Sequence, residues 1–271
     1  MSFNMKKIAY LVISCDHYSD VWKYNASLLR KFWPDLDYST FILTNEKEFD
    51  EYGFQALKTG KDVSWSYNFL VAITQLKDMG YEYVFTTFDD FLLVQRVDTE
   101  LLKKSISLFI KEKGNCLRFE RKQCPKIKKY NDVFGEIYNN VPYRMILGFA
   151  LWNIDTLLKL VDSKESAWEF EKNGVERSFN YDKFYCTYIS PFKYINLIIK
   201  RKLVSGSYKK LQEVLPGTVI DRETWSPRKE KFKAVLLRLF MHHFPVKYQY
   251  TVYKKFSKPV KLHTLNNNTE K

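Results

Sequence analysis

Cysteine and glycine are scarce in this chain, and their scarcity argues against several classes of protein. The 271 residues include only 4 cysteines (Cys15, Cys116, Cys124 and Cys186), and no two of them have C-x-x-C spacing. This usage is typical of a reducing compartment rather than of a disulfide-rich secreted domain. No G-x-G-x-x-G or G-x-x-x-x-G-K-[ST] loop follows the first expected strand, which argues against a dinucleotide enzyme and a P-loop NTPase.

Long hydrophobic runs are also missing, since no stretch approaches the roughly 18 to 20 apolar residues that a membrane-spanning helix needs. Lys6 and Lys7 followed by the apolar run 8–15 imitate a signal peptide, but the run stops at Asp16 without a small-residue cleavage site. We therefore interpret this run as a buried first strand and expect a cytoplasmic protein.

Positive charge is present in excess, but only at one end of the chain. The net charge is +13, and residues 200–271 contribute +12 of it, with 17 Lys and Arg against 5 Asp and Glu. The body of the protein is therefore nearly neutral, and a basic tail needs its own explanation.

Apolar spacing alternates between strand-like and helix-like along the body. Strands are expected at 7–15, 38–44, 54–58, 82–88 and 115–119, and helices follow the first, third and fourth of them. This alternation predicts an α/β fold with a mostly parallel central sheet, helices on both faces and ligands at the carboxyl ends of the strands. Three polar turns fall at those ends: Ser14–His17, Thr44–Asn45 and Asp89–Asp90.

The segments beyond the fifth expected strand have weaker signals. A stretch with five Lys and Arg at 121–130 is expected to be an exposed loop, 143–153 is a long apolar run, and an acidic helix begins at Ala167. No internal repeat or clear linker precedes about residue 222, which favours one catalytic domain over 1–222 and a basic, aromatic-rich tail over 223–271.

The acidic pair Asp89-Asp90, at the end of an apolar strand and before the apolar residues 91–94, is the sharpest local feature. Adjacent carboxylates can hold Mg²⁺ or Mn²⁺, which neutralises a diphosphate leaving group. A solvated turn or a helix cap is the alternative interpretation.

The order of these parts resembles the GT-A type nucleotide-sugar glycosyltransferases of bacterial capsule and lipopolysaccharide assembly. The similar segments are 11–22, 41–45, Ser64-Trp65-Ser66, 83–92 with its acidic pair, 150–153 and 167–171. The resemblance covers residues 7–206 and implies a Rossmann-like GT-A fold with a nucleoside diphosphate sugar as donor. The family's DXD-type motif here reads Phe-Asp-Asp, without an acid at Phe88.

The resemblance implies roles for individual residues of this chain. Asp90 would be the ligand of a Mn²⁺ or Mg²⁺ ion, and Asp89 would lie near the ribose or the donor sugar. The remaining donor-site residues would be Ser14 and Asp16 beside the nucleotide, Thr44 and Asn45 near the base, and Ser66 at a helix start. Trp65, next to Ser66, belongs to a helical stripe and is expected in the core.

Sugar transfer with inversion needs a base for the acceptor hydroxyl, and Glu169 and Glu171 are the candidates. Trp168 would offer a stacking surface for a sugar. However, Ser166 and Glu169 also fit a capping box, in which Glu169 would serve the start of the helix instead. Glu169 is the favoured base by a narrow margin, and the sequence leaves inversion or retention open. The pair His242-His243 is expected to be a surface feature rather than a metal site.

The tail is expected to form a helix from Pro227 to about Phe244. Apolar and aromatic residues with Lys and Arg around them, as in 226–271, are typical of a peripheral helix on an anionic membrane. The enzyme would then work on a glycan or lipid-linked glycan acceptor at the cytoplasmic face of the inner membrane. Packing of the tail on the body is the alternative.

Two other functions remain as rivals. A nucleotidyltransferase could use the same acidic pair, and a nucleic-acid-binding protein could use the basic tail with its aromatic residues. The body contains no helix-turn-helix, RRM or zinc-finger pattern, so nucleic acid is the weaker partner.

Overall fold

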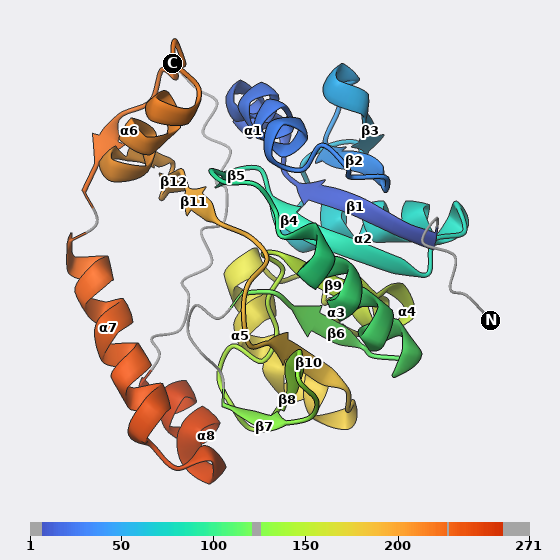
Figure 1. Ribbon diagram of the computed structural model, residues 1–271, viewed down its shortest axis with the longest axis vertical. Helices are drawn as coiled ribbons and strands as arrows, with labels where there is room; N and C mark the ends of the chain where they lie inside the picture. The colour runs from blue at the N-terminus through green and yellow to red at the C-terminus, as the bar shows by residue number, and fades with distance from the viewer. Residues whose placement is uncertain (1–6, 121–125, 227, 257–271) are drawn as a thin grey trace.

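The computed structural model describes residues 7–120, 126–226 and 228–256 (Figure 1). Four parallel strands form the N-terminal half of a nine-stranded sheet in the order β3-β2-β1-β4. All six residues of the central strand β1 are buried, which explains its continuous apolar sequence. The bounds of the strands are Ile8–Ile13 for β1, Ser39–Thr44 for β2, Phe54–Lys58 for β3 and Tyr83–Phe88 for β4.

The other half of the sheet has mixed directions, so the expectation of a mostly parallel sheet was wrong. The strands are β6 (Cys116–Arg118), β7 (Ile127–Lys129), β8 (Phe134–Ile137), β9 (Ala150–Asn153) and β10 (Phe184–Thr187). β9 runs antiparallel to both β4 and β6, and β8 runs antiparallel to β10 and β7. A buried strand has the same apolar sequence in either direction, so the sequence could not reveal this reversal.

Part of the expected basic loop is a strand, because Ile127–Lys129 pairs with Phe134–Ile137 at the edge of the sheet. Residues 121–125 of that stretch lie outside the described residues. Short 3-10 helices occur at Asp16–Tyr18, Glu51–Gly53 and Ser178–Asn180.

Helices cover both faces of the sheet, as predicted. Helices α1 (Ser19–Phe32) and α3 (Thr99–Lys111) share a core cluster with Ile8, Tyr10 and Val12 of β1. The alternate residues of β1 face the other cluster, which includes α2 (Trp65–Asp78), α4 (Ile154–Leu160) and α5 (Ala167–Arg177). This two-residue alternation is what a strand between two helical layers requires.

A tight turn at Asp89-Asp90 connects β4 to the short strand β5 (Phe91–Leu93), which pairs antiparallel with β11 (Tyr194–Asn196). The side-chain amide of Asn25 in α1 donates to the backbone oxygens of Phe88 (3.3 Å), Asp89 (3.0 Å) and Phe91 (3.4 Å). The buried side-chain amide of Asn25 therefore holds the backbone of the acidic turn in place.

The C-terminal part begins with a three-stranded sheet and helix α6. The elements are β12 (Ile198–Ile199), β13 (Lys202–Val204), α6 (Ser205–Val214), β14 (Thr224–Trp225), α7 (Arg228–His243) and α8 (Val246–Phe256). β14 pairs with β13, so Thr224 and Trp225, which follow the expected domain boundary at 222, belong to this sheet. Pro227 and residues 257–271 of the expected tail lie outside the described residues. Among the residues that are described, no helix is both long and apolar enough to cross a bilayer.

Gly148 tests the packing of the strand that follows the acidic turn. A Cβ at this position would lie 2.6 Å from the ring of Phe91, which stacks on Tyr194 and cannot move freely. Gly148→Ala is expected to destabilise the fold by about 1–3 kcal/mol in urea unfolding, because overpacking displaces that ring. Gly206→Ala is the matched control, since a Cβ there meets nothing within 4 Å. Equal stabilities of the two variants would contradict this account.

Candidate functional site

The polar turns expected at the carboxyl ends of the strands lie along one edge of the sheet. Parallel pairing of β1 with β2 and with β4 brings the ends of these strands together. The segments that meet there are Ser14–Asp16, Thr44–Asn45 and Asp89–Asp90. β9 enters the sheet at the same edge, since Ala150 at its start pairs with Thr86 near the end of β4.

Asp89 is a buried carboxyl group, with 6% of its surface exposed. It accepts a hydrogen bond from the hydroxyl of Ser14, which in turn accepts one from the Trp22 indole N–H at 2.6 Å. Burial raises the pKa of Asp89 well above its usual value, and the neighbouring charge of Asp90 adds to this effect. Burial thus shifts Asp89 toward its neutral, protonated form.

Asp90 is the more exposed member of the pair, and its backbone oxygen accepts from the N–H of Leu197 at 2.8 Å. The residues present do not fit a metal ion held by the protein alone. Within the described parts of the chain there is no group of three His, Cys, Asp or Glu side chains that could ligate one.

Asp16 connects the loops after β1 and β2. Its carboxylate accepts from the backbone N–H groups of Asn45 (2.9 Å), Glu46 (2.9 Å) and Lys47 (3.0 Å). Its own N–H donates to the side-chain oxygen of Asn45 at 3.0 Å. Asp16 thus shapes the edge of the site through backbone contacts.

Thr44 and Asn45 each have one polar side-chain atom without a partner. The Thr44 hydroxyl and the Asn45 Nδ2 are buried and have no hydrogen-bond partner within the part of the chain that the structure describes. Leaving such groups unpaired costs about 1–3 kcal/mol each.

Ser66 and Trp65 serve the packing of helices. The Ser66 hydroxyl is fully buried and donates to the backbone oxygen of Glu165, just before α5. The Trp65 ring stacks on Phe69 at 5.0 Å and lies 6.1 Å from Phe170. These contacts join α2 to α5.

Glu169 forms the capping box that was the alternative to its role as base. Its Oε2 accepts from both the N–H and the hydroxyl of Ser166 at 2.8 Å, and the N–H of Glu169 donates to the same hydroxyl at 3.3 Å. This carboxylate is committed to the start of α5. Trp168 beside it is 72% exposed and free to contact a ligand.

Glu171 lies in a different environment. Its Oε1 accepts from the N–H of Leu147 at 3.3 Å, just before β9. Burial raises the pKa of Glu171 to about 7, although that hydrogen bond and the charge of Arg118 oppose the rise. A carboxyl group with this pKa can take up a proton at neutral pH.

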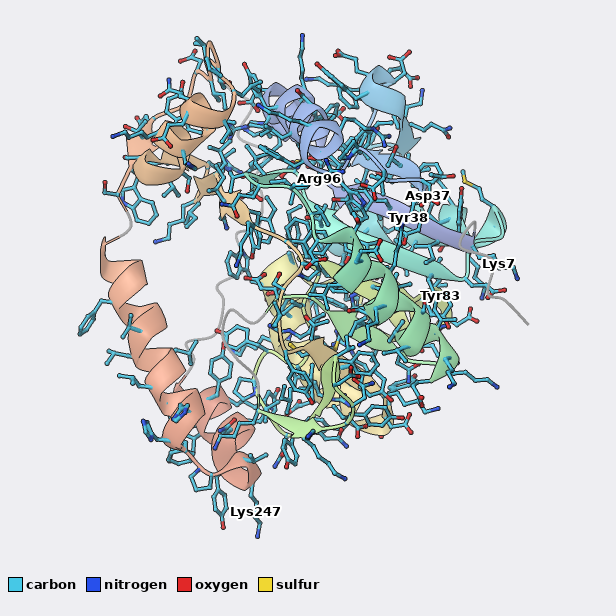
Figure 2. All side chains as sticks on the ribbon, in the orientation of Figure 1. Lys7, Asp37, Tyr38, Tyr83, Arg96 and Lys247 are labelled. Atoms are coloured by element: carbon cyan, nitrogen blue, oxygen red, sulfur yellow. The ribbon has the colours of Figure 1, made fainter. Side chains whose placement is uncertain are left out.

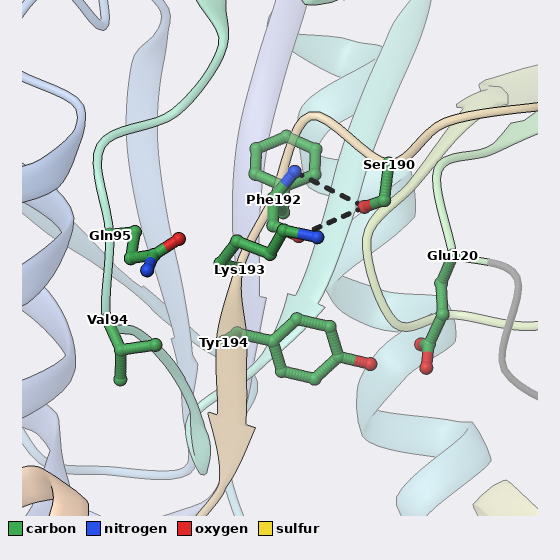
Figure 3. Close-up of a pocket in the computed structure, with 7 residues that line it drawn as sticks. All are labelled: Val94, Gln95, Glu120, Ser190, Phe192, Lys193 and Tyr194. Atoms are coloured by element: carbon green, nitrogen blue, oxygen red, sulfur yellow. Dashed lines mark hydrogen bonds between the residues drawn. The ribbon is translucent and has the colours of Figure 1, made fainter.

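Three residues near Glu171 and Asp90 were missed by sequence reasoning: Arg118, Glu120 and Tyr194. Arg118 is fully buried and donates to the backbone oxygens of Glu120 (3.0 Å) and Tyr143. Tyr194 points its hydroxyl at the Glu120 carboxylate in a pocket of about 410 Å³ (Figure 3). The signal for Arg118 and Glu120 was their place at the end of an expected strand, whereas Tyr194 had none.

Arg222 was also missed, because 202 residues separate it from its partner Asp20. Its guanidinium binds both carboxylate oxygens of Asp20 at 2.7 Å and donates to the His17 backbone oxygen at 3.1 Å. It also lies 4.5 Å above the Tyr18 ring, which places a fixed cation near the end of β1.

The fold is similar to solved glycosyltransferase structures at low identity. No protein-family model and no curated protein sequence matches the chain.

Staphylococcus aureus TarS 1–349 has a TM-score of 0.48 and 12% identity over 94% of this chain and 75% of that one. Its complex with UDP has a TM-score of 0.45 and 12% identity, over 93% of this chain and 75% of that one. In a second, longer TarS structure, the match covers only 46% of that chain. Galactosyltransferase LgtC, solved with donor and acceptor sugar analogues, has a TM-score of 0.37 and 11% identity over 89% and 98% of the two chains. Likeness at this level establishes neither a shared family nor a shared activity.

The burial of Asp89 predicts a pH-dependent effect of its amide variant. The folded-state pKa lies above the unfolded value of about 3.9, so the stability contributed by the neutral carboxyl is lost as the pH rises. The amide of Asp89→Asn cannot ionise. Its melting temperature relative to the unmodified chain is expected to increase between pH 4 and pH 8, by at least about 2 °C. Asp35→Asn, at an exposed position, should show no such trend. A difference for Asp89→Asn that is constant across this range would contradict the assignment.

Proposed function

We propose that this protein is a glycosyltransferase that moves a sugar from a nucleoside diphosphate sugar to a growing bacterial surface glycan. One observation supports it most: two buried carboxyl groups lie at one end of the sheet. Burial raises the pKa of Asp89 well above its usual value and that of Glu171 to about 7. Carboxyl groups whose pKa is raised by burial are typical of sites that move protons.

The donor would bind where β1, β2 and β4 end. Thr44 and Asn45, at the end of β2, would lie near the base, and Asp89 with Ser14 would lie near the ribose or sugar. Asp90 would lie at the reacting end of the donor. Any ion accompanying the diphosphate would come with the donor, since the described residues contain no group of three side chains that could ligate one.

We propose Glu171, rather than Glu169, as the base. In an inverting transfer, the acceptor oxygen would bond to the anomeric carbon while the bond from that carbon to the diphosphate oxygen breaks. The proton of the acceptor hydroxyl would pass to Glu171, and the diphosphate would leave as the nucleoside diphosphate. Glu169 lacks this freedom because its carboxylate serves the helix cap.

The acceptor would lie between α5 and the β5–β11 pair. Trp168 is an exposed ring at the start of α5, and Glu120 and Tyr194 line the pocket shown in Figure 3. Hydroxyl-rich sugars suit such a mixture of aromatic faces and hydrogen-bonding groups. The proposed acceptor is a capsule, lipopolysaccharide or O-antigen glycan attached to lipid at a membrane surface.

A panel of nucleotides and nucleotide sugars, measured by thermal shift with and without Mn²⁺, tests the donor site. Stabilisation by a nucleoside diphosphate sugar is expected because binding to the folded state raises the melting temperature. Asp90→Asn should retain the fold but lower transfer at least about tenfold, through loss of a charge at the reacting end. No stabilisation by any nucleotide or sugar nucleotide would refute the proposal, and stabilisation by triphosphates alone would favour the nucleotidyltransferase.

Glu171→Gln and Glu169→Gln form a matched pair that tests the base. A base with a pKa of about 7 must be deprotonated, so kcat should fall about tenfold per pH unit below that value. Glu171→Gln should lower kcat about 10²–10⁴-fold and abolish this limb of the profile. Glu169→Gln should keep the profile and cost at most about 0.5–2 kcal/mol of stability, as a cap variant. Equal effects on kcat would exclude Glu171 as the base.

A further inference from the structure

Helix α8 is attached firmly to the body. Gln249 and Tyr250 are buried, and the Tyr250 N–H donates to the Asn140 backbone oxygen at 3.1 Å. The Tyr253 hydroxyl donates to that of Tyr143 at 2.9 Å. Lys254 forms an ion pair of 2.6 Å with Glu176, on the same helix as Glu171. Packing on the body, one of the two expected fates of the tail, therefore applies to α8.

Helix α7 differs, because it has an inner and an outer apolar face. Leu237 and Phe240 pack against the core cluster under α2 and α5. The outer face consists of Phe232 (65% exposed), Val235 (47%), Leu236 (50%) and Leu239 (50%). These four positions follow the i, i+3, i+4, i+7 spacing of one side of a helix. We call them the α7 row.

Exposed apolar residues in a contiguous row indicate a contact surface rather than a random surface. The net charge of the segment that contains the row limits what can cover it. Residues 228–271 contain 11 Lys and Arg against 2 Asp and Glu. A second copy of the chain would bring two such positive segments together, which is unfavourable, whereas an anionic surface would be attracted.

The end of the row has groups that suit a lipid headgroup region. Tyr248, at the start of α8, is 51% exposed, and the ammonium group of Lys247 lies 5.6 Å from its ring centre. Lys247 points away from the body at the outer end of the α7–α8 pair (Figure 2). Tyrosine and lysine are favoured at membrane interfaces because their stems are apolar and their tips are polar.

We propose that the α7 row inserts into the surface of an anionic bilayer, to which the net positive charge of the tail is attracted, and that α8 holds α7 to the body. In Figure 1 the arrowheads of β1 and β6 point toward the side of the molecule on which α7 stands. The row would thus hold the carboxyl ends of these strands on the membrane side. This inference depends on the tail alone and not on the transfer reaction.

The test uses the full chain and vesicles of phosphatidylcholine with and without phosphatidylglycerol, in a co-sedimentation assay. Leu236→Ser combined with Leu239→Ser is expected to weaken binding to anionic vesicles at least about tenfold, since two half-buried leucines contribute about that much. Binding of the unmodified chain should fall as salt rises, through screening of the headgroup contacts. Substitution is preferable to deletion of 226–271, which would remove the buried Gln249 and Tyr250.

Val219→Ser combined with Ile189→Ser is the matched control, because these residues are 77% and 68% exposed but lie outside the tail. The control should bind vesicles like the unmodified chain, and both double variants should keep its melting temperature. Equal loss in both variants, or no vesicle binding by the unmodified chain, would overturn the proposal. A concentration-dependent dimer that only the α7 variant dissociates, in a chain that ignores vesicles, would assign the row to a second copy instead. Vesicle binding without any nucleotide binding would leave this inference standing and refute the proposed function.

Discussion

A single buried amide fixes the geometry on which the candidate site depends. Asn25 donates to three backbone oxygens around the turn between β4 and β5, and thereby holds the acidic pair against α1. The next chain segment, β5, can then pair with β11 and bring Tyr194 to the same edge. Without this constraint, two adjacent carboxyl groups at a strand end would form an ordinary solvated turn.

The same turn also explains why the two acidic residues are not equivalent. Asp89 lies in the interior, where Ser14 and Trp22 form a hydrogen-bonded chain to it, while Asp90 lies nearer the solvent. Burial raises the pKa of Asp89 well above its usual value, and the neighbouring Asp90 adds to this effect.

Local sequence patterns were sufficient to predict most elements of the body and the edge at which ligands are expected. The capping box at Ser166 was confirmed by its reciprocal contacts with Glu169. Such features depend on residues three or four positions apart. Strand direction in the second half of the sheet, and the approach of Arg222 to Asp20, depend on contacts between distant segments that no local pattern encodes.

The choice between the two candidate bases likewise depends on a contact that no local sequence pattern encodes. Glu169 and Glu171 look alike in the sequence, and both belong to an acidic helix start. The loop before β9 distinguishes them. The N–H of its residue Leu147 donates to the buried carboxylate of Glu171, whereas Glu169 bonds to its own cap residue, Ser166.

The composition of the tail fits two different roles. Basic and aromatic residues over 226–271 were compatible with either a membrane surface or packing on the body. The two helices differ in this respect. The aromatic residues Tyr250 and Tyr253 of α8 pack against α5 and Tyr143, whereas α7 keeps an apolar face exposed. Composition cannot make this division, because it depends on which side of each helix meets the body. The excess charge is therefore best understood together with the α7 row, since an exposed apolar face and a dense positive charge are each costly for a free protein and both are stabilised by an anionic surface.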